Sequence, residues 1–237
     1  MVNSLQKEIQ NVITIDGPSG SGKGTVSQLL ADKLGWRILD SGALYRVLGL
    51  ATQRHQLSFS DDEKITELAR NLDIEFKING ESGEVEPLFE GENISLLIRT
   101  DEAGQAASKV AAIPTVREAL LARQQDFYQL PGLVADGRDM GTIVFPQAPA
   151  KVFLTASAKC RAERRFNQLK NKGVDANMRA LLDSIKDRDE RDSNRSVAPL
   201  VPASDALIVD SSEMTIDEVL AQIIDFAAKN ILDLKNT

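Results

Sequence analysis

The amino-acid sequence predicts an α/β fold in which a parallel sheet is covered by helices on both faces. Two observations favour this fold. Short apolar runs typical of buried strands alternate along the chain with segments of helical periodicity. A glycine-rich segment also joins the first of these strands directly to a helix. With 237 residues, of which 42% are hydrophobic, the chain is long enough to bury a substantial core.

The first part of the chain is expected to form two strand–helix pairs. The first run of apolar, β-branched residues stops at Gly17, as a short buried strand would. Val26 and Leu29 then begin an apolar repeat at helical spacing, and Gly35 supplies the stop signal. The expected elements are a strand at 12–16, a helix ending near Leu34, a strand at 36–39 and a helix at 43–55.

A different pattern occupies residues 60–100, after a helix expected at 61–71. Residues 74–78 alternate apolar and polar side chains, and residues 85–89 resume an extended pattern. The segment 79–83 between them contains the turn pairs Asn-Gly and Ser-Gly. We therefore expect a small antiparallel sheet inserted into the alternating chain.

The rest of the chain returns to alternating strands and helices. Pro114 separates two helical patterns, the second of which ends near Tyr128. Two charged helices are broken near Lys172-Gly173, where glycine favours a turn. The other expected elements are strands at 133–136, 151–154 and 206–209 and an amphipathic helix at 216–231.

Composition narrows the functional classes. The net charge of −7 argues against a general nucleic-acid binder, although basic residues outnumber acidic ones within residues 158–195. That excess indicates either a local anion site or a solvated pair of charged helices. No run of 18 apolar residues and no secretory signal is present, and Cys160 is the single cysteine. We expect a cytoplasmic protein without a transmembrane segment.

The segment between the first strand and the first helix matches a phosphate-binding loop, or P-loop. Its glycines let the backbone wrap closely, and the following helix directs free N–H groups at the same place. Lys23 can reach the outer phosphates, and Thr25 offers a hydroxyl to Mg²⁺. Gly24 stands between these two residues, a variant found in nucleoside monophosphate kinases. The alternative is a glycine-rich turn that only connects two elements.

Arginines elsewhere suggest a second phosphate site. Arg138 follows a predicted strand after one glycine, at the strand end where ligands bind in open α/β sheets. Arg188, Arg191 and Arg195 are spaced to share one helix face, with Asp192 beside them. Each arginine could instead be a surface ion-pair partner. A GTPase would also need an Asn-Lys-x-Asp motif, and the nearest match has the wrong spacing.

Several segments resemble the bacterial-type cytidylate kinases, and the resemblance covers nearly the whole chain. The antiparallel insertion looks like the enlarged monophosphate-binding region of this family. The matching segments are Gly17–Thr25, Leu39–Arg46, Ile98–Thr100, Asp136–Thr142, Arg188–Arg195 and Ala198–Leu200.

The resemblance implies a P-loop NTPase-type fold in three parts. We expect a core at about residues 9–58, 113–157 and 196–237, an insertion that binds the nucleoside monophosphate at about 59–112, and a helical lid at about 158–195. The implied reaction is transfer of a phosphate from ATP to CMP or dCMP with Mg²⁺, by a monomer. A kinase of another small acceptor and a non-catalytic nucleotide-binding protein remain as alternatives.

The expected site residues follow from the P-loop and from the resemblance. Lys23, Arg138 and Arg188 are expected to be catalytic, and Thr25 is expected to bind Mg²⁺ together with the ATP phosphates. The expected ATP site consists of Gly17, Pro18, Ser19, Gly20, Ser21, Gly22, Lys23, Gly24, Thr25, Arg161 and Arg165. The CMP site implied by the resemblance consists of Ser41, Tyr45, Arg46, Arg99, Ser108, Arg117, Arg138, Asp139, Arg188, Asp192 and Arg195.

The chemistry of cytosine agrees with the implied base contacts. The resemblance assigns Asp139, Arg117 and Ser108 to the base. A carboxylate can accept from the cytosine amino group, while arginine and serine can donate to its acceptor atoms. Uracil has an oxygen in place of that amino group, so we expect a preference for CMP over UMP. Asp40 and Asp136, at the ends of predicted strands, are candidates for orienting Mg²⁺ through water.

Overall fold

The computed structural model describes residues 11–78, 85–171 and 173–231, which belong to two compact units. The first unit combines the chain up to Asp40 with the chain from Gln124 onward. The second unit spans Ser41–Arg123. Each unit has its own hydrophobic core.

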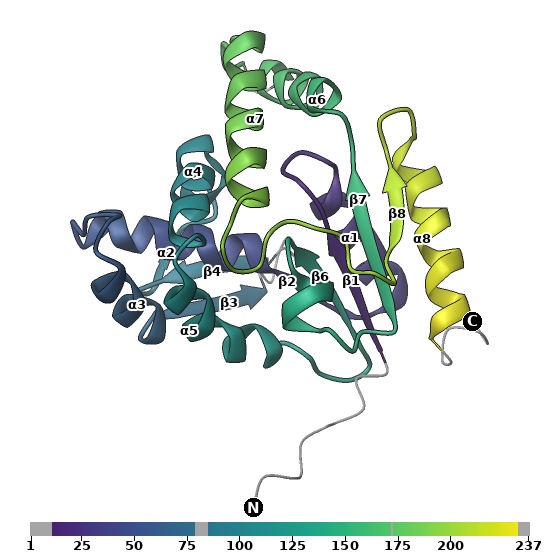
Figure 1. The fold of residues 1–237 in the computed structure, drawn as a ribbon, viewed down its shortest axis with the longest axis horizontal. Coiled ribbons are helices and arrows are strands. Elements are labelled where there is room, and N and C mark those ends of the chain that lie inside the picture. The colour runs from purple at the N-terminus through teal and green to yellow at the C-terminus, as the bar shows by residue number, and fades with distance from the viewer. Residues whose placement is uncertain (1–10, 79–84, 172, 232–237) are drawn as a thin grey trace, which may run out of the picture. The chain divides into compact units, whose positions relative to one another are not determined.

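A parallel sheet of five strands, counted within the described residues, forms the centre of the first unit (Figure 1). Its strand order is β2-β6-β1-β7-β8, and every neighbouring pair is parallel. This confirms the predicted parallel sheet. The strands are β1 (Val12–Asp16), β2 (Arg37–Asp40), β6 (Leu133–Gly137), β7 (Ala150–Thr155) and β8 (Leu207–Asp210).

Helices cover both faces of this sheet. Ile13 and Ile15 of β1 belong to the same core cluster as residues of α1 and α8. Thr14 points to the opposite face, because side chains alternate along a strand. A Cβ on Gly141, in the short π-helix η2, would lie only 2.8 Å from the Thr14 hydroxyl, so η2 packs on that face. The helices of this unit are α1 (Lys23–Leu34), η2 (Met140–Val144), α6 (Ala158–Asn171), α7 (Met178–Ser193) and α8 (Ile216–Asn230).

The second unit is a helical cluster with a small antiparallel sheet of strand order β3-β4-β5. Its core includes Leu44, Ile65, Phe89 and Leu120. The predicted antiparallel insertion is thus confirmed, while its two predicted turn pairs lie outside the described residues. The elements are α2 (Ser41–Arg54), α3 (Asp62–Arg70), β3 (Ile74–Ile78), β4 (Val85–Phe89), β5 (Glu92–Asn93), the 3-10 helix η1 (Leu97–Arg99), α4 (Asp101–Val110) and α5 (Pro114–Gln125).

Leu29 is 40% exposed although it belongs to the apolar repeat of α1. One local expectation was wrong: Arg188, Arg191 and Arg195 do not share one helix face, because α7 ends at Ser193 with Asn194 as its C-cap. Arg195 therefore follows the helix. In residues 11–78, 85–171 and 173–231, no helix is long and apolar enough to cross a membrane.

Gly17→Ala is expected to lower the free energy of unfolding more than Gly35→Ala does. Both glycines have a positive φ, 149° and 63°, which costs other residues about 1–3 kcal/mol. A Cβ on Gly17 would additionally lie 2.0 Å from the carbonyl oxygen of Leu154, whereas no described atom would lie within 4 Å of one on Gly35. Urea unfolding compares the two variants. Equal losses would show that the close approach of β7 is unimportant.

Candidate active site

The P-loop leaves β1 at Gly17 and enters α1 at Lys23. Gly22 is the N-cap of α1 in a left-handed conformation, with φ of 98°. The first amide groups of α1 are therefore at the end of the loop, where a helix N-terminus attracts anions. The Lys23 side chain is buried and its Nζ donates to the carbonyl oxygen of Pro18 at 2.9 Å, so its head lies over the loop.

The electrostatic surroundings of Lys23 disfavour its own charge. Burial is the largest effect and, with the nearby guanidinium groups of Arg138 and Arg188, lowers the pKa of Lys23 to about 7. The carboxylates of Asp136 and Asp16 act in the opposite direction. Cations that repel one another in a buried place form a site that a phosphate would stabilise.

Two arginines of α6 hold the outside of the P-loop. Arg161 donates through Nη1 to the carbonyl oxygen of Ser19 at 3.1 Å and pairs with Asp189 of α7 at 2.9 and 2.5 Å. Arg164 donates through Nη1 to the carbonyl oxygen of Ser21 at 3.2 Å. Because these contacts engage loop carbonyls, they fix the direction of the peptide planes. Arg164 lies in the segment whose resemblance implied a lid, but it was not among the residues expected at the ATP site.

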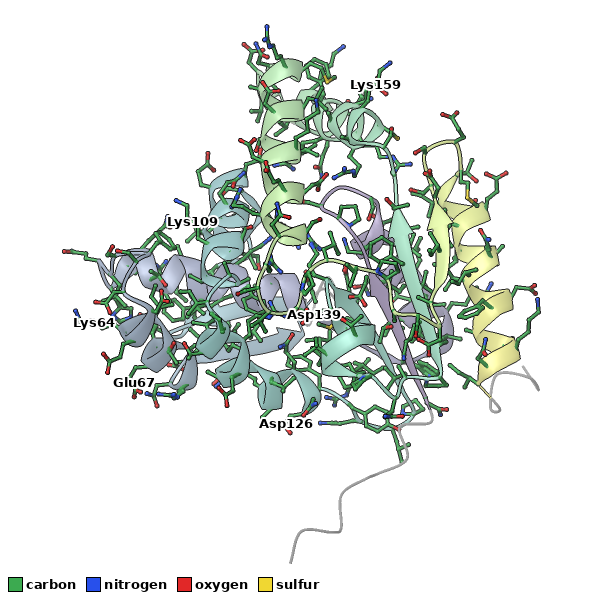
Figure 2. The ribbon with its side chains drawn as sticks, viewed as in Figure 1. Lys64, Glu67, Lys109, Asp126, Asp139 and Lys159 are labelled. Carbon is green, nitrogen blue, oxygen red and sulfur yellow. The ribbon has the colours of Figure 1, made fainter. Side chains whose placement is uncertain are left out.

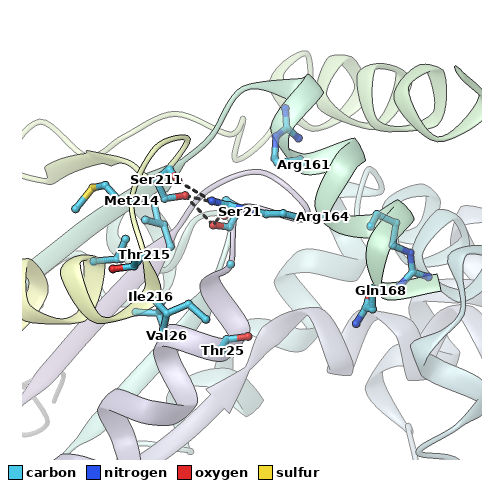
Figure 3. A pocket seen from close by; sticks show the side chains of 15 residues that line it. Ser21, Thr25, Val26, Arg161, Arg164, Gln168, Ser211, Met214, Thr215 and Ile216 are labelled. Atoms are coloured by element: carbon cyan, nitrogen blue, oxygen red, sulfur yellow. Dashed lines mark hydrogen bonds between the residues drawn. The ribbon is translucent and has the colours of Figure 1, made fainter. Parts of the chain in front are cut away.

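A cavity of about 480 Å³ adjoins the P-loop on this side (Figure 3). Arg164 connects its walls, because its Nη2 donates to the carbonyl oxygen of Ser211 at 2.6 Å. The segment from Ser211 to α8 contributes lining residues that sequence reasoning missed, since no motif marks it. Arg161 and Arg165, both expected at the ATP site, line the cavity as well. The lining residues are Gly20, Ser21, Gly22, Thr25, Val26, Leu154, Arg161, Arg164, Arg165, Gln168, Ser211, Met214, Thr215, Ile216 and Val219.

Asp192 joins the arginines predicted for the monophosphate. It is 1% exposed, accepts from Nε of Arg138 at 3.0 Å and pairs with Nη2 of Arg195. Burial alone would raise the pKa of Asp192, but Arg138, Arg195 and Arg188 outweigh it and hold the pKa below its usual value. Arg188 also donates through Nη1 to the Ser19 hydroxyl at 3.2 Å, so this cluster reaches the P-loop.

The turn after β6 carries Asp139, which is 2% exposed and is the N-cap of η2 (Figure 2). The amides of Met140 and Gly141 that begin η2 donate to Oδ1 and Oδ2 of Asp16, each at 2.8 Å. Asp16 was not singled out from the sequence. Its position at a strand end, directly before the first glycine of the P-loop, was the available signal.

The second unit brings together several other residues predicted for CMP. Arg117 of α5 is buried and lies over the ring of Tyr45 of α2, 5.5 Å from its centroid. Ser108 of α4 is 2% exposed. Arg46 donates to the carbonyl oxygen of Ile98 at 3.0 Å. Ser41 begins α2, and Arg99 ends η1.

A P-loop at the carboxyl edge of a parallel sheet, with a buried lysine beside an arginine cluster, defines a P-loop phosphotransferase. Residues 13–229 match the sequence model of the cytidylate kinase family. The chain belongs to this family.

Individual relatives are similar over nearly their whole length. The cytidylate kinase of Colwellia psychrerythraea strain 34H is 60% identical over 221 residues, which cover 93% of this chain and 97% of the relative. That of Shewanella baltica strain OS155 is 58% identical over 222 residues, covering 94% and 96%. A solved gluconokinase from Sinorhizobium meliloti 1021 has a TM-score of 0.48 and 16% identity over 97% of this chain and 98% of the other, a likeness too distant to add to the assignment.

Asp192→Asn is expected to lower the free energy of unfolding at pH 7 by about 3–5 kcal/mol, because two arginines lose a buried carboxylate. The pKa of Asp192 is lowered by folding, so its stabilising contribution is complete above about pH 4 and is lost as pH falls. The difference from the wild type should therefore narrow below about pH 4.

Urea unfolding at a series of pH values measures this difference. Asp205→Asn is the control, since Asp205 is 60% exposed in its pair with Lys151 and such pairs contribute about 1 kcal/mol or less. A difference for Asp192→Asn that stays constant down to pH 3 would contradict the assignment of charge to this carboxylate.

Proposed function

We propose that this protein transfers the γ-phosphate of ATP to CMP and dCMP, forming ADP with CDP or dCDP in pyrimidine nucleotide metabolism. The observation that carries the proposal is the hydrogen bond from Arg188 to the hydroxyl of Ser19 in the P-loop, at 3.2 Å, beside the pair of Arg138 with Asp192. One phosphate-binding loop thereby adjoins a second set of phosphate-binding side chains. Membership of the cytidylate kinase family supplies the acceptor.

We propose that the cavity beside the P-loop receives the adenosine of ATP. Its volume of about 480 Å³ lies within the range of about 300–1,000 Å³ that is usual for small-molecule sites. Met214, Ile216 and Val219 provide apolar surface, while Gln168 and Thr215 provide polar groups. The triphosphate then extends along the loop amides toward Lys23.

Mg²⁺ fits the oxygen donors at the start of α1. Thr25 lines the cavity, and a Cβ on Gly24 would lie 3.6 Å from Oδ2 of Asp136, which places this carboxylate beside the same turn. No group of three or more metal-binding side chains occurs in the described ranges. Mg²⁺ suits such a site because it retains water and takes phosphate oxygens. We propose that Thr25 holds the ion with the phosphates, that Asp136 rather than Asp40 orients it, and that it neutralises phosphate charge.

Phosphoryl transfer is catalysed by positioning and charge neutralisation. Lys23 contacts the outer phosphates and, with Arg138 and Arg188, stabilises the charge of the transferring group. Arg188 reaches the P-loop through Ser19, and Arg138 is oriented by Asp192. These contacts fix the two guanidinium groups relative to Lys23. An oxygen of the CMP phosphate attacks the γ-phosphorus in line, without a covalent enzyme intermediate.

The residues proposed to bind CMP are assigned separately for each unit. On the first unit, we assign Asp139 to the base, Asp192 to the sugar, Arg138 and Arg188 to the phosphate, and Arg195 to support of Asp192. The pair Asp192–Arg138 supports this grouping. On the second unit, we assign Ser108 and Arg117 to the base and Arg46 to the phosphate. Ser41, Tyr45 and Arg99 complete the proposed set, and the Tyr45–Arg117 contact supports it. We also propose that the enzyme is cytoplasmic and monomeric.

A panel of nucleoside monophosphates with ATP and Mg²⁺ tests the reaction, with ADP release as the readout. CMP and dCMP should be phosphorylated. The kcat/KM for UMP should be at least about tenfold lower, because one lost charged hydrogen bond costs about 1.5–3 kcal/mol. ADP release with shikimate or another small acceptor, and not with CMP, would reject the proposed function. An absence of ADP release with every monophosphate would reject it as well.

Lys23→Ala and Arg138→Ala should have different effects. Loss of Lys23 removes a transition-state contact and should lower kcat by at least about 100-fold. Arg138→Ala should raise the KM for CMP while the Kd for ATP stays nearly unchanged. Steady-state kinetics and ATP titration measure these constants.

Arg54→Ala is the matched control for the arginine, since Arg54 pairs with Glu92 on the second unit and has no assigned role. It should leave both constants unchanged. Loss of ATP affinity with retained CMP use in Arg138→Ala would contradict the division between the two substrates.

A further inference from the structure

The start of η2 is capped in an unusual way. An aspartate at the N-cap of a helix ordinarily folds back to accept from the helix's own second or third amide. Asp139 occupies this N-cap position, but within the described residues its side chain makes no capping hydrogen bond. Asp16, at the end of β1, instead accepts from the amides of Met140 and Gly141.

The direction of Asp16 follows from the strand. Thr14 and Asp16 lie on the same face of β1 because side chains alternate, and η2 packs on that face. Asp16 is 4% exposed, and its two oxygens each serve one amide. β1 also pairs in register with β6, with Asp16 opposite Gly137. The carboxylate therefore lies beside the turn that leads from β6 to Asp139.

We infer that Asp16 is a positioning residue for the acceptor: by holding the first amides of η2, it keeps the carboxylate of Asp139 from capping the helix and directed to the pyrimidine. This inference rests on the proposed function, which assigns Asp139 to the base. Asp16 itself touches no reacting atom.

Charge reinforces the separation of the two carboxylates. Burial raises the pKa of Asp16 to about 7, hydrogen bonds from Gly141 and Met140 oppose this, and the negative charge of Asp139 raises the pKa further. The two carboxylates repel each other when both are ionised. While Asp16 occupies the amides, an approach of Asp139 to them is unfavourable.

Replacing Asp16 should redirect Asp139. In Asp16→Asn, the shape is kept, but an amide NH₂ group replaces one of the two acceptor oxygens that face the helix N–H groups. One amide of η2 then needs a new acceptor, and the N-cap carboxylate of Asp139 is adjacent in sequence. Once Asp139 caps η2, it no longer accepts from cytosine.

The test measures kcat/KM for CMP and for UMP, together with the KM for ATP, in the wild type and in Asp16→Asn. We expect the CMP/UMP ratio to fall by about tenfold, since small displacements of a binding group cost one to two orders of magnitude. The KM for ATP is a separate readout, because Asp16 also acts on the charge of Lys23. A merely structural role would lower turnover of both monophosphates in parallel, and an unchanged ratio would overturn the inference.

Three further variants sharpen the test. In an Asp139→Asn background, Asp16→Asn should cause no additional change of the ratio, because both act through one carboxylate. Asp61→Asn is the matched control: Asp61 accepts from the amide of Lys64 at the start of α3, far along the chain from the acceptor turn. It should leave the ratio unchanged. If Asp16→Asn does not fold, Asp16→Glu serves instead, since it keeps both oxygens but displaces them by one methylene, and it too should lower the ratio.

An NMR measurement separates failure of this inference from failure of the proposed function. If the wild type neither binds nor phosphorylates CMP, the proposed function fails. The carboxyl resonance of Asp139 and the amide resonances of Met140 and Gly141 still report on capping. A scalar coupling across a new hydrogen bond between the Gly141 amide and the Asp139 carboxyl group in Asp16→Asn supports the positioning role, whereas its absence rejects it.

Discussion

The parallel pairing of β1 with β6 is the constraint on which both proposed substrate sites of the first unit depend. Ile15 lies opposite Asp136, and Asp16 lies opposite Gly137. Both strands therefore end at the same edge of the sheet, where the chain has to turn away. One turn becomes the P-loop, and the other carries Arg138 and Asp139. A slip of this register by one residue would move the side chains of β6 to the opposite faces of the sheet.

A P-loop binds anions through backbone N–H groups, so its carbonyl oxygens need hydrogen-bond donors on the other side. Arg161 and Arg164 provide these donors to the carbonyl oxygens of Ser19 and Ser21. Asp189 fixes Arg161 in turn, which connects α7 to the same loop. The charged helices after β7 thus contact the loop directly. Some arginines of these helices therefore bind protein groups and do not merely face solvent. Arg165 and Gln168, in contrast, form an exposed hydrogen bond with each other.

Sequence patterns predicted the order and type of the longer elements because each carries a full period of apolar residues. β5, η1 and η2 span only two, three and five residues, which is too short for such a period. The P-loop was predictable because its function needs particular residues at fixed spacing. Arg164, Asp16 and the cavity residues from Ser211 onward were not, since their roles depend on neighbours distant in sequence. Arg195 was misplaced because periodicity does not show where α7 ends.

The two turns at the sheet edge need different kinds of support. Backbone amides bind a triphosphate whatever the side chains around them, provided that glycines allow the loop its shape. A pyrimidine must instead be read by side chains, and a side chain on a turn is directed only if the turn is held. The strand pairing fixes the residues up to Gly137 but not the peptide planes beyond it. The hydrogen bonds from Met140 and Gly141 to Asp16 fix the peptide planes that follow the turn after β6. The same short stretch of β1 therefore leads into the P-loop and holds the turn proposed to bind the pyrimidine.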